Sequence, residues 1–366
     1  MDPQPVLIDV YPWLKQIELR GFVPMEGVFR HAEALCRLYY PAVTYSATDT
    51  PFKSLTMDLL GEYLGKSVFV LRENEHPIDA QFEMLGTKWW VSLAVDAPSP
   101  WLDRKTNVKK LAILHDSLSL EGVFGEFQKQ QFIKGALSND VFAYVSTTAL
   151  HDFCKHLPQL KRSTPFEFVK YGCFHEFDAD PLSASVLTPR SSDRTISVSS
   201  IFPRKNIARA REITKALGLR HYHVGHRREM DETEFARLAI EEEVNFLGEL
   251  SESTLRKVYR ASQCFVCASF QEGFSMPAME AILLGVPNIL LSDIMAHREI
   301  YGSYAVNFFN PKSPVQHVKA DSPFLYSVTE ENRKEIFLRF SKETVMRPLR
   351  NLLEDKPEIE VPFPKI

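Results

Sequence analysis

The chain lacks any hydrophobic stretch long enough to cross a membrane. Its apolar runs are interrupted by glycine, proline or charged residues well before the roughly 20 residues that a spanning helix needs. It also lacks a basic segment followed by an apolar one near its start, so no secretory signal is expected. These absences predict a cytoplasmic protein rather than an integral membrane or secreted one.

Cysteines are few, and positive charge is not in excess. Five cysteines, an odd number, predict a reduced compartment without a disulfide framework. Cys264 and Cys267 have CxxC spacing, but they lie inside an expected strand without a second pair, so we interpret them as core residues. A net charge of −4 and a pI near 6.3 give no general attraction to nucleic acid or anionic lipid.

The sequence also has no cluster of metal ligands, such as an Asp-x-Asp pair, and no short internal repeat. We therefore expect no metal and no other cofactor. The 45% hydrophobic and 25% charged fractions are typical of a globular protein, and 366 residues exceed the comfortable size of one core. Composition and length together predict two domains.

Short apolar strands alternate with helices over most of the chain, which predicts an α/β fold. Residues 181–194 are rich in serine, proline and aspartate, and they form the best candidate linker. We predict a first domain at residues 1–180 and a second at 195–340. A helix around 334–354 and a tail complete the chain, with 341–366 as the C-terminal segment.

The most informative segment runs from Glu272 to Glu280. The apolar run Cys264–Ser269 before it predicts a buried strand, and 288–291 after it predicts the next one. Between them a helix is expected to end near Gly285. The segment is therefore a strand–loop–helix–strand unit with a carboxylate at each end of the loop region.

The start of this expected helix is a candidate anion site. Ser275 is a plausible N-cap, and Pro277 suits the first turn because its missing N–H costs nothing there. The free N–H groups of Phe274, Ser275 and Met276 would face the loop, with the positive end of the helix dipole behind them. Such a site fits a diphosphate.

The two carboxylates suit sugar hydroxyls better than phosphate. Glu280, expected in the first turn, can accept two hydrogen bonds from the paired hydroxyls of a ribose, and Glu272 can hold a second sugar. Diphosphate, ribose and sugar together describe a nucleotide-sugar. The alternative is an ordinary helix start with two solvated carboxylates.

Residues 195–206 predict a second strand and loop of the same kind. A strand at 195–199 precedes the loop, and a helix follows with Ile207, Ala210 and Ile213 on one face. The loop would place Arg204 and Lys205 at the C-terminal edge of the sheet, where open α/β folds bind ligands. A solvated surface pair is the alternative.

These two segments resemble retaining glycosyltransferases of family 4, which have the two-domain architecture called GT-B. Glu272 and Glu280 match the family's Glu-x7-Glu signature, and residues 195–206 match its opening strand and phosphate loop. The resemblance implies an α/β fold of two Rossmann-like βαβ domains that face each other across a cleft. It also implies a C-terminal helix that crosses back to the first domain.

The resemblance also assigns roles to residues of the second domain. It places Lys205 on the diphosphate and Glu272 on the sugar, and it places Leu247 and Gly248 beside the base. The donor-binding residues that it implies are Ser200, Arg204, Lys205, Leu247, Gly248, Phe274, Ser275, Met276 and Glu280. Glu272, Lys205 and His115 are the implied catalytic residues.

The first domain carries a sparser match and would bind the acceptor. The segment from Gly27 to Leu35 resembles the family's glycine-containing loop and first helix, and residues 111–116 resemble its strand that ends in His-Asp. Gly27, Arg30 and Asp116 are therefore expected on the acceptor side. A structural role remains the alternative for His115. Trp13, Trp89, Trp90 and Trp101 either stack on acceptor sugars or pack in the core.

Ser199, Ser200 and Tyr171 depart from the family pattern. The resemblance nevertheless implies transfer of a sugar, with GDP-mannose as the first donor to consider, to a hydroxyl of a glycan or glycolipid in polysaccharide biosynthesis, with retention of configuration. Two alternatives are a degenerate GT-B protein that binds nucleotide-sugar without transfer and a GT-B sugar-nucleotide epimerase. The basic segment 104–110 is either a solvated loop or a peripheral membrane contact near a lipid-linked acceptor.

Overall fold

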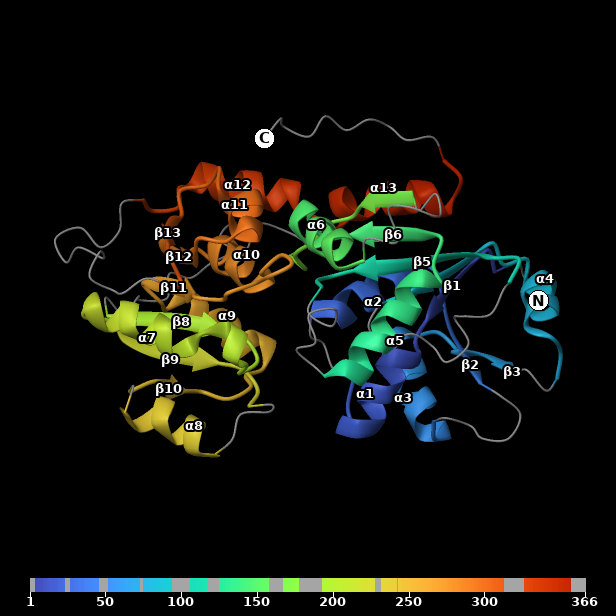
Figure 1. Cartoon of the computed structure of the whole chain (residues 1–366), viewed down its shortest axis with the longest axis horizontal. Coiled ribbons are helices and arrows are strands. Elements are labelled where there is room, and N and C mark those ends of the chain that lie inside the picture. The colour runs from blue at the N-terminus through green and yellow to red at the C-terminus, as the bar shows by residue number, and fades with distance from the viewer. Residues whose placement is uncertain are drawn as a thin grey trace. The chain divides into compact units, whose positions relative to one another are not determined.

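The computed structural model describes residues 4–23, 27–45, 52–72, 75–93, 106–117, 125–157, 167–177, 193–227, 232–241, 243–312 and 326–356. The chain divides into two compact units, residues 1–172 with 346–366 and residues 173–345 (Figure 1). The predicted linker 181–194 lies outside the described residues except for its last two positions. In the described part, no helix has both the length and the apolar character needed to span a membrane.

The first unit is built on a parallel sheet in which the described strands follow the order β3-β2-β1-β4-β5-β6-β7. Parallel strands need a crossover between them, and a helix supplies most of these connections. The strands are β1 (Val6–Asp9), β2 (Tyr40–Tyr45), β3 (Phe69–Arg72), β4 (Trp89–Ser92), β5 (Lys109–Leu114), β6 (Val141–Tyr144) and β7 (Glu167–Lys170). The helices are α1 (Tyr11–Arg20), α2 (Gly27–Leu38), α3 (Ser54–Leu64), α4 (Ile78–Leu85), α5 (Glu126–Leu137) and α6 (Thr147–His156).

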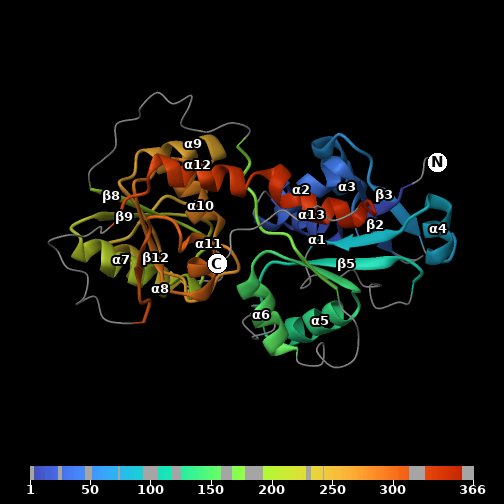
Figure 2. The ribbon, with the colours of Figure 1, turned by 90° about the horizontal axis from the view of Figure 1, so that it is seen from above.

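Helices cover both faces of this sheet, as a parallel sheet requires. Phe82 of α4 packs with Trp90, and Phe132 of α5 packs with Phe142 and Phe153 on the same face. Helices α1, α2 and α3 lie on the opposite face (Figure 2). Because both faces are covered, every residue of β1 and β4 is buried, including Asp9 and Ser92 at their ends.

Tryptophan burial decides between the two alternatives. Trp13, Trp89 and Trp90 are at most 2% exposed, so these three pack in the core and do not stack on a sugar. Trp101 lies outside the described residues. The basic segment 104–110 is also not a simple loop, because its last two lysines belong to β5 and Lys110 is buried.

The helix that begins at Gly27 is the second of its unit and not the first. Helix α1 precedes it, with Pro12 in its first turn and Gly21 in a left-handed conformation at its end. Its buried residues are Pro12, Trp13, Leu14 and Ile17, and the last three have a spacing that fits one face of a helix. The apolar residues of this segment therefore already have the spacing of a helix in the sequence.

The second unit contains a parallel sheet of described strands in the order β10-β9-β8-β11-β12-β13. Its strands are β8 (Arg194–Val198), β9 (Arg220–Val224), β10 (Asn245–Phe246), β11 (Cys264–Cys267), β12 (Asn288–Ser292) and β13 (Asn307–Phe309). Its helices are α7 (Ile207–Ala216), α8 (Glu232–Ala236), α9 (Glu252–Arg260), α10 (Met276–Leu283), α11 (Met295–Tyr301) and α12 (Glu330–Arg339), with a π-helical turn at Arg237–Glu241. The expected strands at 195–199, 264–269 and 288–291 are confirmed within one or two residues.

The single helix expected around 334–354 is wrong, because two helices occupy that region. Helix α12 ends before Phe340, and α13 (Lys342–Leu353) begins after Ser341. The hydroxyl of Ser341 accepts the N–H of Thr344 at 3.3 Å and caps the new helix. His175 N–H donates to the Phe340 carbonyl at 3.0 Å, so a distant strand-like segment binds the backbone at the break.

From Met346 onward the C-terminal segment belongs to the first unit, so the chain returns to the domain in which it began. The Tyr39 hydroxyl donates to Glu354 Oε1 at 3.1 Å, and Lys88 pairs with Asp355 at 2.9 Å. Helix α13 is drawn with the elements of this unit in Figure 2. The expected return of the last helix is therefore present.

Candidate functional site

The candidate site lies where the strand order of the second sheet reverses. β8 and β11 are neighbours in the sheet. The chain continues from β8 to β9 on one side of this pair and from β11 to β12 on the other side. Such a reversal opens a crevice at the carboxyl ends of the two strands. The loop after β8 forms a 3-10 turn at Pro203–Lys205, and the loop after β11 carries Glu272. The N–H of Phe270 donates to the Arg204 carbonyl at 2.9 Å and ties the two loops together.

Glu272 is the centre of a charged cluster in this crevice. Its Oε1 atom lies 2.5 Å from Lys205 Nζ, and its Oε2 atom lies 3.6 Å from the Arg204 guanidinium. The Ser269 hydroxyl donates to Oε1 at 2.6 Å. Burial by itself would raise the pKa of Glu272, but the Lys205 and Arg204 charges and these hydrogen bonds lower it to about 2. Glu272 is therefore ionised.

The cluster has two cations for one carboxylate, so it carries net positive charge at the edge of the sheet. Arg204 also donates to the Gln271 carbonyl at 3.1 Å, which fixes its guanidinium across the second loop. The Lys205 side chain is 15% exposed, so an anion can reach the ammonium. These features suit an oxyanion that competes with Glu272 for Lys205.

The turn before α10 differs from the expected N-cap. Ser275 occupies the cap position, but its φ of +70° is left-handed and its side chain makes no capping hydrogen bond. The Tyr301 hydroxyl donates to its carbonyl at 2.8 Å and holds this conformation. Pro277 is in the first turn as expected and has no N–H, and the Ala278 N–H donates to the Ser275 carbonyl at 3.1 Å.

Phe274 and Glu280 also differ in detail from expectation. Phe274 is buried against Tyr301 and Phe340, so only its backbone is available to a ligand. Because α10 begins at Met276, Glu280 falls in the second turn and not the first. Its Oε2 atom accepts the Tyr259 hydroxyl at 3.4 Å. The Glu280 carboxylate is thus displaced along the helix from the anion site. At that position it suits a neighbouring diol better than a phosphate.

The departures at Ser199 and Ser200 carry no backbone strain. Neither residue has a positive φ, so serine occupies both positions without the conformational cost that glycine would avoid. Gly225 shows where glycine is required, because its φ is +151° and an added Cβ would lie 1.8 Å from the Ser199 carbonyl oxygen.

Leu247 and Gly248 lie apart from the Glu272 cluster, at the end of β10, which β9 and β8 separate from β11. Gly248 has a φ of +67°, and its carbonyl accepts the Gly225 N–H at 2.9 Å. Leu247 is 38% exposed. A ligand that reaches both places has to extend along the sheet edge, as a nucleotide-sugar would.

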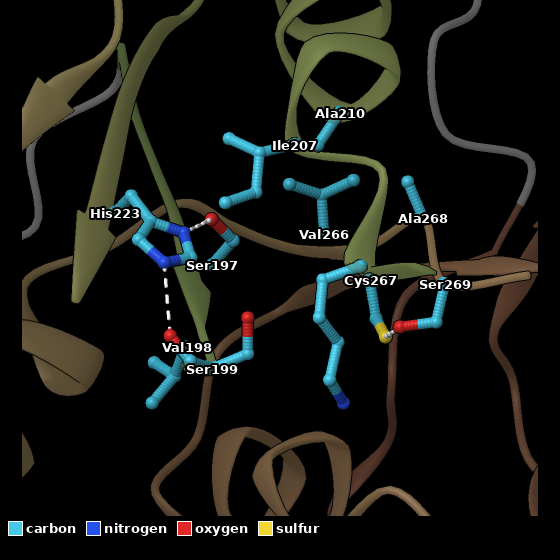
Figure 3. A pocket seen from close by; sticks show the side chains of 11 residues that line it. Ser197, Val198, Ser199, Ile207, Ala210, His223, Val266, Cys267, Ala268 and Ser269 are labelled. Atoms are coloured by element: carbon cyan, nitrogen blue, oxygen red, sulfur yellow. Dashed lines mark hydrogen bonds between the residues drawn. The ribbon is translucent and has the colours of Figure 1, made fainter. Parts of the chain in front are cut away.

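A small hollow lies at the same sheet edge (Figure 3). It is lined by Ser197, Val198, Ser199, Lys205, Ile207, Ala210, His223, Val266, Cys267, Ala268 and Ser269. Cys267 and Ser269 share one face of β11 and its extension, since residues two apart in a strand point the same way. Our interpretation of Cys267 as a core residue is wrong, because this residue is partly exposed and lines the hollow, although Cys264 is fully buried as expected.

A buried histidine network behind the hollow was not expected from the sequence. Ser197 Oγ lies 2.7 Å from His221 Nε2 and 2.8 Å from His223 Nδ1, and His223 Nε2 lies 3.0 Å from the Ser199 carbonyl. A carbonyl only accepts, so His223 Nε2 carries the proton and Ser197 donates to Nδ1. Burial lowers the pKa of His223 to about 4, so the ring is neutral. The network fixes the backbone after β8.

In the first unit, His115 follows β5 and its Nε2 atom donates to the Leu93 carbonyl at 3.2 Å. Its ring is 5.3 Å from that of His31, whose Nδ1 atom is 3.0 Å from the Tyr171 hydroxyl. Burial lowers the pKa of His115 to about 4, so this imidazole is neutral. Tyr171, a departure from the family pattern, is therefore part of a polar cluster with two histidines.

The other predicted acceptor-side residues lie near this cluster in the fold. Helix α2 begins at Gly27, and Arg30 is half-buried in its first turn. Burial is the largest cause that lowers the pKa of His31, and the interactions with His115 and then with the Arg30 charge lower it further. Asp116 directly follows His115 and is half-buried. Sequence reasoning missed His31, although it lies one residue beyond Arg30 on the same helix.

Part of the sequence is similar to known proteins. Residues 181–321 match the model of the family described as Glycosyl transferases group 1. An uncharacterized glycosyltransferase of Methanocaldococcus jannaschii is 26% identical over 126 residues, which cover 31% of this chain and 31% of that protein. The match therefore spans about a third of the length of this curated relative.

Solved structures share the fold of the whole chain. Sucrose-phosphate synthase from Thermosynechococcus elongatus has a TM-score of 0.64 at 14% identity and covers 96% of this chain and 98% of its own. The Anabaena protein HepE, in complex with UDP and glucose, has a TM-score of 0.63 at 14% identity, and the match covers 96% of this chain and 100% of HepE. At such identities the likeness shows the fold alone, which is GT-B.

Proposed function

We propose that this chain, whose residues 181–321 form a glycosyl transferases group 1 domain within a GT-B fold, transfers a sugar from a nucleotide-sugar to an acceptor hydroxyl. The observation that carries the proposal is the cluster of Lys205, Arg204 and Glu272 at the switch point of the second sheet. Cations, a carboxylate and a helix start meet there, and a diphosphate joined to a sugar needs all three.

The donor diphosphate would bind Lys205, Arg204 and the N–H groups at the start of α10. This contact releases Glu272 from its ion pair with Lys205, so the carboxylate can accept hydrogen bonds from the sugar hydroxyls. Glu280 would hold the ribose, and Leu247 and Gly248 would border the base. The donor then lies along the sheet edge from β10 to β11.

Transfer forms a bond from the acceptor oxygen to the anomeric carbon and breaks the bond from that carbon to phosphate. The acceptor attacks from the side that the phosphate leaves, which retains configuration, and its proton passes to the departing phosphate oxygen. Negative charge develops on this phosphate, so Lys205, Arg204 and the oriented N–H groups stabilise the transition state. We propose no metal or other cofactor for this step.

The first unit would bind the acceptor, a glycan or a glycolipid. His115, Asp116, Arg30 and the start of α2 at Gly27 are the proposed contacts. A neutral His115 donates its Nε2 proton to the Leu93 carbonyl, so its Nδ1 atom can accept a hydrogen bond from a sugar hydroxyl without the cost of burying a charge. For a lipid-linked acceptor we propose a cytoplasmic protein that contacts the membrane peripherally.

We propose GDP-mannose as the first donor to test and UDP-glucose as the second. The first follows from the Pro203–Asn206 loop sequence, which is similar to that of family members that use mannose in polysaccharide biosynthesis. The second is motivated by HepE, which was solved in complex with UDP and glucose. Binding measurements with the two donors therefore decide which nucleotide base the protein uses, because the fold does not.

Substitution of Lys205 and Glu280 tests the proposal. Lys205→Ala should lower kcat about 10²-fold, the usual effect of losing one group that stabilises developing negative charge. Glu280→Ala should mainly raise the donor KM, because a ribose contact persists through the reaction. Sugar transfer measured by mass spectrometry, with the exposed Lys215→Ala on α7 as the matched control, gives both values.

Two outcomes point elsewhere. Nucleotide binding without transfer or slow hydrolysis would indicate a degenerate binding protein, and a new sugar-nucleotide formed without acceptor would indicate an epimerase. Activity of both variants at the level of Lys215→Ala would overturn the proposed site.

A further inference from the structure

Three polar side chains lie inside the second sheet, between β8 and β9. Ser197 stands opposite His223 in the register of the two strands, and His221 lies two residues before His223 on the same face of β9. All three residues are at most 7% exposed. A buried polar network is costly unless its members have partners, and a well-paired network fixes the geometry of the groups that it joins.

The direction of each hydrogen bond in this network follows from its last acceptor. The Ser199 carbonyl can only accept, so His223 donates from Nε2 and its Nδ1 atom is an acceptor. The Ser197 hydroxyl therefore gives its one proton to His223 Nδ1, and its oxygen accepts the proton of His221 Nε2. His221 Nδ1 agrees with this assignment, because it is buried and no acceptor for a proton there lies in the described part of the chain.

The network ends where the loop toward the charged cluster begins. Ser199 directly follows β8 and opens the loop that carries Lys205. The Ser199 N–H donates to the Val224 carbonyl at 3.0 Å, and the Ser199 carbonyl accepts His223 Nε2 at 3.0 Å (Figure 3). Gly225 leaves room for this carbonyl, because an added Cβ would lie 1.8 Å from its oxygen. The backbone at the start of the loop is thus held through both its N–H and its carbonyl.

His223 also lies close to the Lys205 ammonium at the end of this loop. Both residues line the hollow at the sheet edge. Burial is the largest cause that lowers the pKa of His223, and the Lys205 charge lowers it further. Because the ring is neutral, it does not attract a diphosphate by charge, and its connection to Lys205 runs through the hydrogen-bonded backbone.

We propose that His223 is a positioning residue for sugar transfer, an inference that rests on the proposed function. The directed hydrogen bonds from His221 through Ser197 to His223 hold the Ser199 carbonyl, and so they set where the loop presents Lys205 to the donor diphosphate. In this role His223 touches neither the phosphate nor the sugar. Since Lys205 stabilises charge that develops on the leaving phosphate, displacement of the loop weakens transition-state binding more than donor binding.

Two substitutions separate the hydrogen bond of His223 from the bulk of its ring. His223→Gln keeps an amide N–H near the position of Nε2, so it can still donate to the Ser199 carbonyl. His223→Asn has its amide only near the position of Nδ1, so it can pair with Ser197 but does not reach Ser199. His223→Asn should lower kcat about 10-fold and change the donor KM less than about 3-fold, because a misplacement of about 1 Å can cost up to about 10²-fold in rate.

His223→Gln should keep both constants within about 3-fold of the unsubstituted chain, since the bond to Ser199 is retained. His151→Asn, at an exposed histidine of α6, makes the same change away from the network and is the matched control. Sugar transfer measured by mass spectrometry gives kcat and KM, and urea unfolding gives the stability of each variant. Equal losses of kcat in the Asn and Gln variants, or unchanged kcat in His223→Asn, would overturn the proposal.

Combination with Lys205→Ala tests whether His223 acts through Lys205. In the Lys205→Ala background, His223→Asn should lower kcat by less than about 2-fold, because the group that it positions is already absent. A further loss of about 10-fold would overturn the positioning role and leave the proposed function intact. An unchanged kcat in Lys205→Ala alone would instead contradict the proposed function, and the inference with it.

Because His223 is buried and its variants can unfold, the unsubstituted chain provides an independent test. NMR of protein with isotope-labelled histidine nitrogens distinguishes the two neutral tautomers of each ring at pH 7. His221 and His223 should both carry their proton on Nε2. A proton on Nδ1 of either ring would break the direction of the network and overturn the proposal, whether or not the protein transfers a sugar.

Discussion

At the residue scale, Glu272 is ionised because its charged neighbours outweigh its burial. Its side chain is only 8% exposed, which would by itself favour the protonated form. Lys205, Arg204 and Ser269 reverse that preference, and they come from two loops that are distant in sequence. The identity of the acid was predictable from the Glu272–Glu280 segment, whereas its partners required the fold.

The stability of the protein should depend on pH through Glu272. Its folded pKa is about 2 against an ordinary value of 4.5, so its contribution is fully present above pH 4.5 and is lost as pH falls toward 2. That difference corresponds to about 3 kcal/mol. Glu272→Gln should therefore cost up to about 3 kcal/mol at pH 7, and the gap from the unsubstituted protein should narrow between pH 5 and 3.

Urea unfolding at pH 7, 5, 4 and 3 measures this gap. Glu335→Gln, at an exposed residue of α12 whose carboxylate accepts the Tyr304 hydroxyl at 3.3 Å, controls for the loss of a hydrogen-bonded carboxylate elsewhere. A difference between Glu272→Gln and the unsubstituted chain that stays constant over this range would show that the ion pair does not hold the pKa down.

At the scale of elements, the strand, loop and helix around residues 264–283 follow from sequence, but the turn between them does not. Apolar runs predict β11 and α10, and Pro277 marks the first turn. Ser275 was expected to cap the helix and instead adopts a left-handed conformation. The Tyr301 hydroxyl, which comes from α11, decides this, and local sequence carries no sign of it.

The left-handed Ser275 predicts an unusual response to glycine. This conformation costs a non-glycine residue about 1 kcal/mol, which offsets the unfolded-state entropy that glycine adds. Ser275→Gly should therefore leave the free energy of unfolding within about 0.5 kcal/mol of its original value or raise it. Ala278→Gly, in the interior of α10, should lower the free energy by about 1 kcal/mol or more.

Thermal and urea unfolding of the two variants provide the comparison. If Ser275→Gly destabilises the protein as much as Ala278→Gly does, the left-handed turn is absent or carries no strain.

At the scale of the molecule, the alternation of strands and helices predicts two parallel sheets, because parallel strands need crossovers. The resemblance of the segments around Lys205 and Glu272 identifies the GT-B fold. The break between α12 and α13 was not predictable, since it depends on a backbone contact from His175. The Ser197, His221 and His223 network was missed for a similar reason, because its members meet only when β8 and β9 pair.

The whole account depends on one claim, that the second unit binds a nucleotide-sugar. A thermal-shift screen of UDP, GDP, dTDP and ADP with their common sugars tests it most directly. A ligand at a hundred times its dissociation constant adds about 2.7 kcal/mol to stability, which raises the melting temperature by a few degrees. The account predicts that one nucleotide gives this shift and that Glu280→Ala abolishes or reduces it. Absence of a shift with every nucleotide would contradict the donor site.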